Sequence, residues 1–124
     1  MVSDDRSAAF DRRVIGVIVA LGEGEVVSYG DIAHDAGYPG RARAVGALLA
    51  REGGDLPWWR VVRGDGRLVA PSAAAQAAAL RAEGVTVRAG RVVAAPRGRF
   101  RRAAPSTRRT RSGQSARSAA GTAT

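Results

Sequence analysis

The chain has 124 residues, a net charge of +9 and no cysteine, which leaves room for one small domain. The lack of a thiol excludes disulfides, thiolate metal sites and any enzyme with a cysteine nucleophile. No apolar run is long enough to span a membrane and no cluster has the spacing of metal ligands, so no membrane, metal or cofactor is expected.

The first half of the chain is patterned as three short helices. Apolar side chains at three- and four-residue spacing predict an amphipathic helix that ends at Gly22: Phe10, Val14, Val17, Ile18 and Leu21. After an extended pair at residues 26–27, Ser28 is a suitable N-cap for a second helix, with Asp31 placed to bond back to it. Gly37 predicts the end of that helix, because glycine readily adopts the left-handed conformation.

The third predicted helix starts near Gly40 or Arg41 and has two different faces. One face is apolar and should pack inward: Ala44, Val45, Leu48 and Leu49. The other face is small apart from one arginine: Arg43, Gly46, Ala47 and Ala50. A bare face of this kind suits a DNA groove, to which helix-turn-helix units present their second helix, but it also suits another helix of the same protein. The pattern by itself leaves both interpretations open.

The second half of the chain is predicted to hold two small β-hairpins and one helix. Trp58 and Trp59 are adjacent, so on an extended segment they would point to opposite sides. The first hairpin is expected about Asp65–Gly66 and the second, resembling a wing, about residues 89–90. An alanine-rich helix over residues 72–83 lies between them.

Residues 1–95 are therefore predicted to form one mainly α domain with small β-hairpins, of the winged helix-turn-helix type. Residues 96–124 hold eight arginines, no acid and a single aromatic, Phe100, which predicts a disordered basic tail. Such a tail would add DNA affinity that falls steeply with salt, or it would merely aid solubility. The acidic first residues do not resemble a signal peptide, so a cytoplasmic, nucleoid-associated protein is expected.

Several motifs, in order and spacing, resemble one family of DNA-binding domains. The motifs are Ser28-Tyr29-Gly30-Asp31-Ile32-Ala33, then Ala36-Gly37-Tyr38-Pro39, then Arg41-Ala42-Arg43-Ala44-Val45-Gly46. They are similar to the DNA-binding domain of the O6-alkylguanine-DNA alkyltransferases, and the resemblance covers roughly residues 8–95. The family's Pro-Cys-His-Arg-Val motif stands here as Pro57-Trp58-Trp59-Arg60-Val61, with Trp58 in place of the nucleophile. That tryptophan is the mark of the non-catalytic alkyltransferase-like proteins.

The resemblance implies roles for individual side chains. Tyr29 matches the tyrosine that pushes on the phosphate beside the target nucleotide, and Arg43 matches the arginine finger that fills the vacated stack. Trp58 matches the wall of the base pocket, and Ser72 matches a serine that contacts guanine. The implied DNA-binding residues are Tyr29, Arg41, Arg43, Gly46, Ala47 and Arg60. The implied lesion-pocket residues are Trp58, Trp59, Val61 and Ser72.

One position departs from the family pattern, and its expected partner is kept. Trp59 stands where the family has a histidine that helps form the thiolate, and Glu83 matches the acid that orients this histidine. Retention of the acid without the histidine has no explanation in the sequence. A role for Glu83 at the end of a surface helix is an equal alternative.

The resemblance implies a non-enzymatic, monomeric sensor that flips alkylated guanine out of duplex DNA and flags it for nucleotide excision repair proteins. One alternative is a winged-helix regulator, which would need polar base-reading side chains where Gly46, Ala47 and Ala50 stand. A second alternative is a nucleoid packaging protein that binds through the basic tail and has no preference for a lesion.

Overall fold

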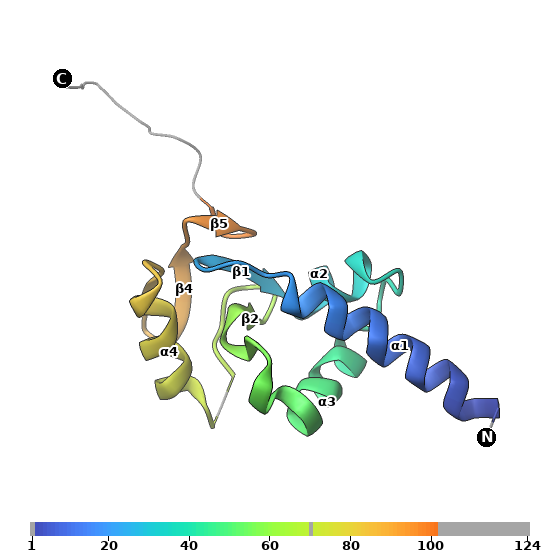
Figure 1. The fold of residues 1–124 in the computed structure, drawn as a ribbon. Helices are drawn as coiled ribbons and strands as arrows, with labels where there is room; N and C mark the ends of the chain where they lie inside the picture. The colour runs from blue at the N-terminus through green and yellow to red at the C-terminus, as the bar shows by residue number, and fades with distance from the viewer. Residues whose placement is uncertain (1, 70, 102–124) are drawn as a thin grey trace, which may run out of the picture.

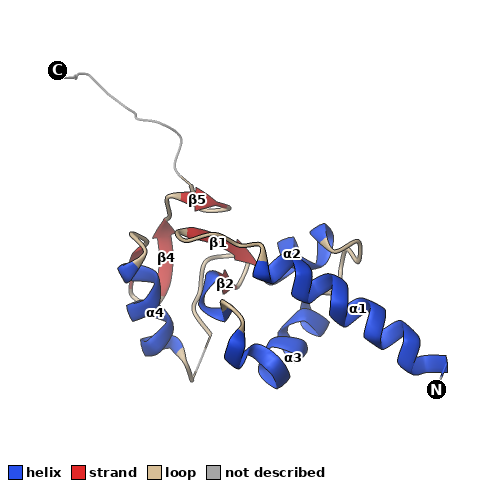
Figure 2. Cartoon of the chain, viewed as in Figure 1, coloured by secondary structure: helices blue, strands red, loops and turns tan. Residues whose placement is uncertain are grey.

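The computed structural model describes residues 2–69 and 71–101 (Figure 1). The helices and helical turns are α1 (Val2–Val19), α2 (Tyr29–Asp35), α3 (Ala42–Glu52), η1 (Gly53–Asp55), η2 (Trp58–Arg60) and α4 (Ala73–Ala82). The strands are β1 (Glu25–Ser28), β2 (Val61–Val62), β3 (Thr86–Arg88), β4 (Arg91–Ala94) and β5 (Arg97–Gly98). Most of the regular structure is helical, and the strands β1, β2 and β4 lie between α4 and the helices α1–α3 (Figure 2). This confirms the predicted mainly α fold. No described helix is both long enough and apolar enough to cross a membrane.

The three predicted N-terminal helices are confirmed and share one core. Val14 and Ile18 of α1, Ile32 of α2, and Val45 and Leu48 of α3 are each at most 1 % exposed. They lie in one cluster. The other apolar positions predicted for the first and third helices either belong to this cluster or pack against it. Burial of these spaced side chains fixes the angle between α2 and α3 and leaves the opposite face of α3 at the surface.

The local signals around α2 act as the sequence predicts. The Ser28 hydroxyl accepts a hydrogen bond from the Asp31 backbone N–H at 3.0 Å, and the Asp31 carboxylate accepts one from the Ser28 N–H at 3.0 Å. This reciprocal capping box satisfies two N–H groups that the first turn would leave without partners. Gly37 has φ +94°, a left-handed conformation that ends the helix and turns the chain toward α3.

The hairpin-like turn predicted about Asp65–Gly66 is present, but no two strands pair across it. Residues 63–67 do form a tight turn, in which the Gly66 N–H donates to the Arg63 carbonyl at 2.8 Å. However, β2 does not pair across this turn: it runs parallel to β1, with Val27 opposite Val61. Arg67, on the other side of the turn, bridges to Arg91 instead. Alternation and turn residues predict a turn, but pairing partners distant in sequence decide where each strand goes.

The second predicted hairpin is confirmed and packs on α4. Strands β3 and β4 pair antiparallel around Ala89 and Gly90, whose φ angles of +51° and +74° suit a tight two-residue turn. A second apolar cluster holds Leu80 of α4 against Val87 and Val92 of the hairpin. In Figure 1, α4 and β4 lie side by side at the end of the molecule away from α1.

The predicted boundary at residue 95 falls too early. Strand β5 pairs parallel with β1, which places Arg97 opposite Glu25 and Gly98 opposite Val26. Gly98 has φ +89° and lies so close to the Val26 backbone that a Cβ would collide with it, so this position requires glycine. Phe100 packs against the second apolar cluster. Strand pairing uses backbone groups, so a composition poor in apolar residues did not prevent it. The rest of the predicted tail, residues 102–124, lies outside the described part of the chain.

Candidate nucleic-acid interface

The small face of α3 remains at the surface. Arg43, Ala47 and Ala50 are exposed, and Gly46 is half-buried. A Cβ built on Gly46 would lie 3.9 Å from the Cδ1 and Cε1 atoms of the Tyr29 ring, an ordinary van der Waals distance. Gly46 therefore packs against the protein's own tyrosine, while its three neighbours face outward, and the contact of this face with DNA stays a prediction.

A cavity of about 400 Å³ opens beside this face. Its lining, drawn from α2, α3 and the segments after β2, is Tyr29, Ala42, Arg43, Gly46, Arg63 and Val69. None of these described lining residues is acidic, so two arginines and a phenol dominate its polarity. Burial raises the pKa of Tyr29, and the nearby positive charge of Arg63 opposes the shift only in part. The tyrosine is therefore a neutral hydrogen-bond donor at physiological pH.

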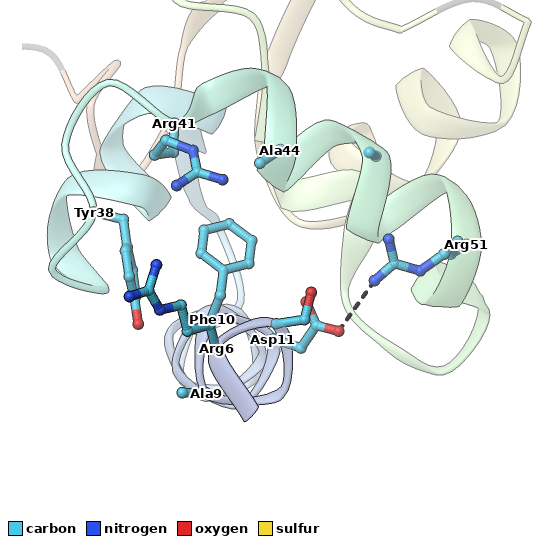
Figure 3. A pocket seen from close by; sticks show the side chains of 10 residues that line it. Arg6, Ala9, Phe10, Asp11, Tyr38, Arg41, Ala44 and Arg51 are labelled. Carbon is cyan, nitrogen blue, oxygen red and sulfur yellow. Dashed lines mark hydrogen bonds and ion pairs between the residues drawn. The ribbon is translucent and has the colours of Figure 1, made fainter. Parts of the chain in front are cut away.

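Arg41 occupies a different place, in a groove between α1 and α3 (Figure 3). Its guanidinium carbon lies 5.2 Å from the centre of the Phe10 ring, within range of a cation–π contact. The groove encloses about 580 Å³ and also includes Arg6 and Ala47. Arg41 is exposed, so its predicted contact with DNA stays a prediction.

The two tryptophans do not lie on an extended segment, as the sequence suggested. They form the 3₁₀ turn η2, and the rings meet edge to face, with centroids 6.2 Å apart and planes at 86°. Both side chains are half-buried. Trp58 also packs close to Gly53, whose built Cβ would lie 3.6 Å from the Cβ of Trp58. The tight turn therefore joins the rings into one aromatic unit instead of sending them to opposite sides.

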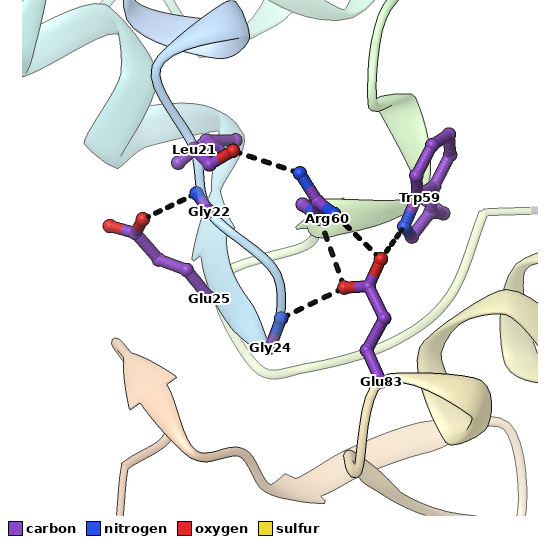
Figure 4. Close-up of polar contacts among 7 residues, drawn as sticks. All are labelled: Leu21, Gly22, Gly24, Glu25, Trp59, Arg60 and Glu83. Atoms are coloured by element: carbon purple, nitrogen blue, oxygen red, sulfur yellow. Dashed lines mark hydrogen bonds and ion pairs between the residues drawn. The ribbon is translucent and has the colours of Figure 1, made fainter.

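Glu83 is the centre of the polar contacts that hold this turn (Figure 4). Its carboxylate accepts hydrogen bonds from Trp59 Nε1 at 2.9 Å and from the Gly24 N–H at 2.9 Å. It also accepts from Arg60 Nε at 3.0 Å and Nη2 at 2.7 Å, a two-point ion pair. Arg60 Nη1 donates to the Leu21 carbonyl at 2.8 Å. One carboxylate thus ties the end of α4 to η2 and to the turn before β1.

This network explains why Glu83 is retained without a histidine and corrects the role predicted for Arg60. Trp59 uses its indole N–H where the family's histidine would donate. Arg60 is 15 % exposed and its guanidinium faces Glu83 and Leu21, so it is a structural ion-pair partner, not a surface cation for DNA phosphates. Burial by itself would raise the pKa of Glu83, but the hydrogen bonds and charge of Arg60, with those from Gly24 and Trp59, lower it to about 2.

Gln76 is a residue that sequence analysis missed. Its side chain is 0 % exposed, in the middle of a helix that otherwise reads as alanine-rich. Its Nε2 donates to the carbonyls of Trp59 at 3.2 Å and Val61 at 3.0 Å, and its Oε1 accepts from the Val69 N–H at 3.0 Å. A lone glutamine in an alanine helix is the one signal that could have indicated this role. The amide ties the tryptophan turn and the start of β2 to α4.

The other two residues predicted to line the lesion pocket, Val61 and Ser72, lie in different surroundings. Val61 is 0 % exposed and belongs to the core, so its side chain supports the pocket from within and does not line it. Ser72 is exposed at the start of α4, where its side chain makes no capping hydrogen bond and its carbonyl accepts from the Gln76 N–H. Its predicted contact with guanine stays a prediction.

Comparison with known proteins agrees with this geometry. The family model described as 6-O-methylguanine DNA methyltransferase, DNA binding domain, matches residues 9–85. A "DNA base-flipping protein" of Escherichia coli (strain K12) is 45% identical in an alignment of 87 positions that covers 67% of this chain and 67% of that protein.

Solved structures show the same fold. The S. pombe Atl1 complex with damaged DNA containing O6-carboxymethylguanine aligns with a TM-score of 0.60 and 28% identity, over 65% of this chain and 81% of that one. Mycobacterium tuberculosis OGT in complex with DNA aligns with a TM-score of 0.54 and 32% identity, over 60% of this chain and 48% of that one. The described fold, its motifs and these matches together place the chain in the family of the 6-O-methylguanine DNA methyltransferase DNA-binding domain.

Proposed function

We propose that this chain is a non-enzymatic sensor that binds O6-alkylguanine in duplex DNA, flips the base out of the stack and marks it for nucleotide excision repair. The observation that carries the proposal is a family DNA-binding fold in a chain with no cysteine, where Trp58 occupies the position of the nucleophile. The relatives named as a base-flipping protein and as Atl1 bound to damaged DNA support the same direction. We include in the proposal a monomeric state and a nucleoid-associated location.

We assign a residue to each part of the proposed process. The exposed small face of α3 enters the minor groove, where small side chains allow close approach to the bases. Tyr29 presents a neutral phenol to the phosphate, and exposed Arg43 is long enough to fill the space that the base leaves. The Trp58–Trp59 unit offers a broad apolar wall for the purine or its alkyl group, worth about 1–3 kcal/mol per stacked base.

The direct test is binding to two matched duplexes at about 150 mM salt, one with O6-methylguanine and one with guanine. We expect at least a tenfold preference for the lesion, about 1.4 kcal/mol, that is lost in Arg43→Ala and Trp58→Ala. Arg12→Ala, which changes an exposed arginine of α1, is the matched control and should keep the preference. Equal affinity of the unmodified chain for both duplexes would favour a DNA packaging or regulatory protein without lesion specificity.

The non-enzymatic part of the proposal needs its own readout. After incubation with a duplex containing O6-methylguanine, intact mass of the chain should be unchanged and the lesion should remain in the DNA. A stoichiometric gain of one methyl group on the protein, with matching loss of the lesion, would show alkyl transfer to a residue other than cysteine.

Gly46→Ala separates folding from DNA binding. Alanine is favoured over glycine inside a helix by roughly 0.5–1 kcal/mol, and the built Cβ meets only the Tyr29 ring at an ordinary distance, so the variant should be slightly more stable. The added methyl group should nevertheless weaken DNA binding, because it stands on the face proposed to enter the groove. Gly16→Ala on α1, where a Cβ would meet nothing within 4 Å, is the matched control for stability and should leave DNA affinity unchanged. Undiminished DNA affinity in Gly46→Ala would place the groove contact elsewhere.

A further inference from the structure

Arg63, to which neither the motifs nor the relatives assign a role, stands at the junction of two cavities beside Tyr29. It lines the 400 Å³ cavity next to Arg43 and also a neighbouring cavity of about 680 Å³ that reaches Arg99. Its backbone is held in the turn after β2, because the Arg63 N–H donates to the Arg67 carbonyl at 3.1 Å and its own carbonyl accepts from Gly66. The side chain is exposed, so a flexible cation projects from a fixed backbone.

The charge of Arg63 is left uncompensated, in contrast to its neighbours. Arg99 pairs with Asp31 at 2.9 Å and donates to the Gly64 carbonyl at 3.2 Å. Arg67 pairs with Asp65 at 3.5 Å. Across residues 6–69 and 71–101, no carboxylate lies within ion-pair distance of the Arg63 guanidinium. The carboxylates near this surface are thus already engaged with other arginines.

The position of Arg63 relative to Tyr29 suits one kind of ligand. Both residues line both cavities, and the charge of Arg63 partly offsets the rise in the Tyr29 pKa that burial causes. A guanidinium and a neutral phenol together offer several N–H donors and one O–H donor. Phosphodiester oxygens are the matching acceptors, since guanidinium groups bind phosphate through two parallel hydrogen bonds.

We propose that Arg63 and Tyr29 form one binding site for a phosphodiester of the DNA backbone, beside the small face of α3 that is proposed to enter the groove. Arg63 is the charged member of this site, and Arg43, which lines the same 400 Å³ cavity, is the residue proposed to fill the vacated stack. This inference rests on the proposed function in one respect, that the ligand is DNA. It does not require the DNA to be damaged. A phosphate contact carries no base information, so it acts on lesion and undamaged duplexes alike.

The test is a salt titration of DNA affinity for the full chain, Arg63→Ala and Arg63→Lys, on the lesion duplex and on the undamaged one. Arg63→Ala should weaken binding about five- to tenfold on both duplexes and reduce the slope of log affinity against log salt by about 1. Arg63→Lys keeps the charge but not the two-point geometry, so it should restore the slope and only part of the affinity. Arg12→Ala, which changes an arginine that lines neither cavity, should alter neither quantity.

The outcomes distinguish this inference from the proposed function. If the unmodified chain shows no lesion preference while Arg63→Ala still lowers affinity and slope, the phosphate site stands and the sensor proposal fails. Unchanged affinity and slope in Arg63→Ala, with an unchanged melting temperature, would overturn the phosphate site. A loss confined to the lesion duplex, with the slope preserved, would also overturn it, because that pattern indicates a contact with the base.

Discussion

Replacing Glu83 with glutamine is expected to lower the free energy of unfolding by about 3 kcal/mol or more. The change removes the partner of Arg60, which is 15 % exposed, and leaves a largely buried guanidinium facing a neutral amide. Breaking one side of such a pair costs about 3–5 kcal/mol, since the remaining charge is neither solvated nor compensated. The melting temperature should fall by roughly 10–20 °C in calorimetry.

The same carboxylate makes the stability of the unmodified protein depend on pH. The pKa of Glu83 is lowered from 4.5 to about 2 in the folded protein, so the unfolded chain takes up the proton first as the pH falls. The ionised carboxylate contributes about 3 kcal/mol to the free energy of unfolding, at about 1.4 kcal/mol per pKa unit. This contribution is complete at pH values above the pKa of Glu83 in the unfolded chain. It should be lost progressively from about pH 5 to pH 2. Chemical unfolding measured at a series of pH values checks this, and Glu83→Gln should flatten that part of the profile.

Glu52→Gln is the matched control for this result. Glu52 is 49% exposed and lies 3.5 Å from Arg51 at the end of α3, so its loss should change the unfolding free energy by less than about 1 kcal/mol. If Glu83→Gln behaves like Glu52→Gln in both melting temperature and acid unfolding, the network around Glu83 does not stabilise the fold.

The second large effect is expected for Gln76→Leu, which keeps the side-chain volume but removes the buried amide. The Val69 N–H and the carbonyls of Trp59 and Val61 would each lose a hydrogen-bond partner. A buried polar group left unpaired costs about 1–3 kcal/mol. Because the structure can relax and reduce part of this cost, the free energy of unfolding should fall by roughly 2–4 kcal/mol in total.

The two tryptophans of the chain both lie on the turn that Gln76 holds, so their fluorescence reports this site directly. Gln76→Leu should shift the tryptophan emission of the folded protein and speed hydrogen exchange of the Val69 amide. Ala78→Leu introduces the same side chain on the exposed face of α4 and should do neither. A stable Gln76→Leu variant with unchanged emission would show that the amide is not needed to fix the turn.

The sequence by itself determined the elements whose causes are local. Ser28 and Asp31 are three residues apart, so their capping box depends only on the helix that they begin. The two faces of α3 follow from helical periodicity, which is why Val45 and Leu48 were placed inside correctly. Ala89 and Gly90 both adopt a left-handed conformation, and this local turn likewise defines the hairpin of β3 and β4. The family's motifs lie mostly in these locally determined segments, so the fold and the candidate DNA-binding face could be predicted together.

Only the tertiary structure decided which distant groups meet. Glu83 lies 24 residues from Trp59, and although the resemblance links the two positions, only the fold shows that the indole N–H donates to this carboxylate. Strand β5 lies within the stretch whose composition predicts disorder, yet Arg97 pairs with Glu25 of β1. Hydrogen bonds and ion pairs of this kind depend on geometry that packing sets, not on residue spacing along the chain. For that reason the sequence indicated Trp58 and Arg43, while the roles of Arg60, Gln76 and Glu83 emerged only from the fold.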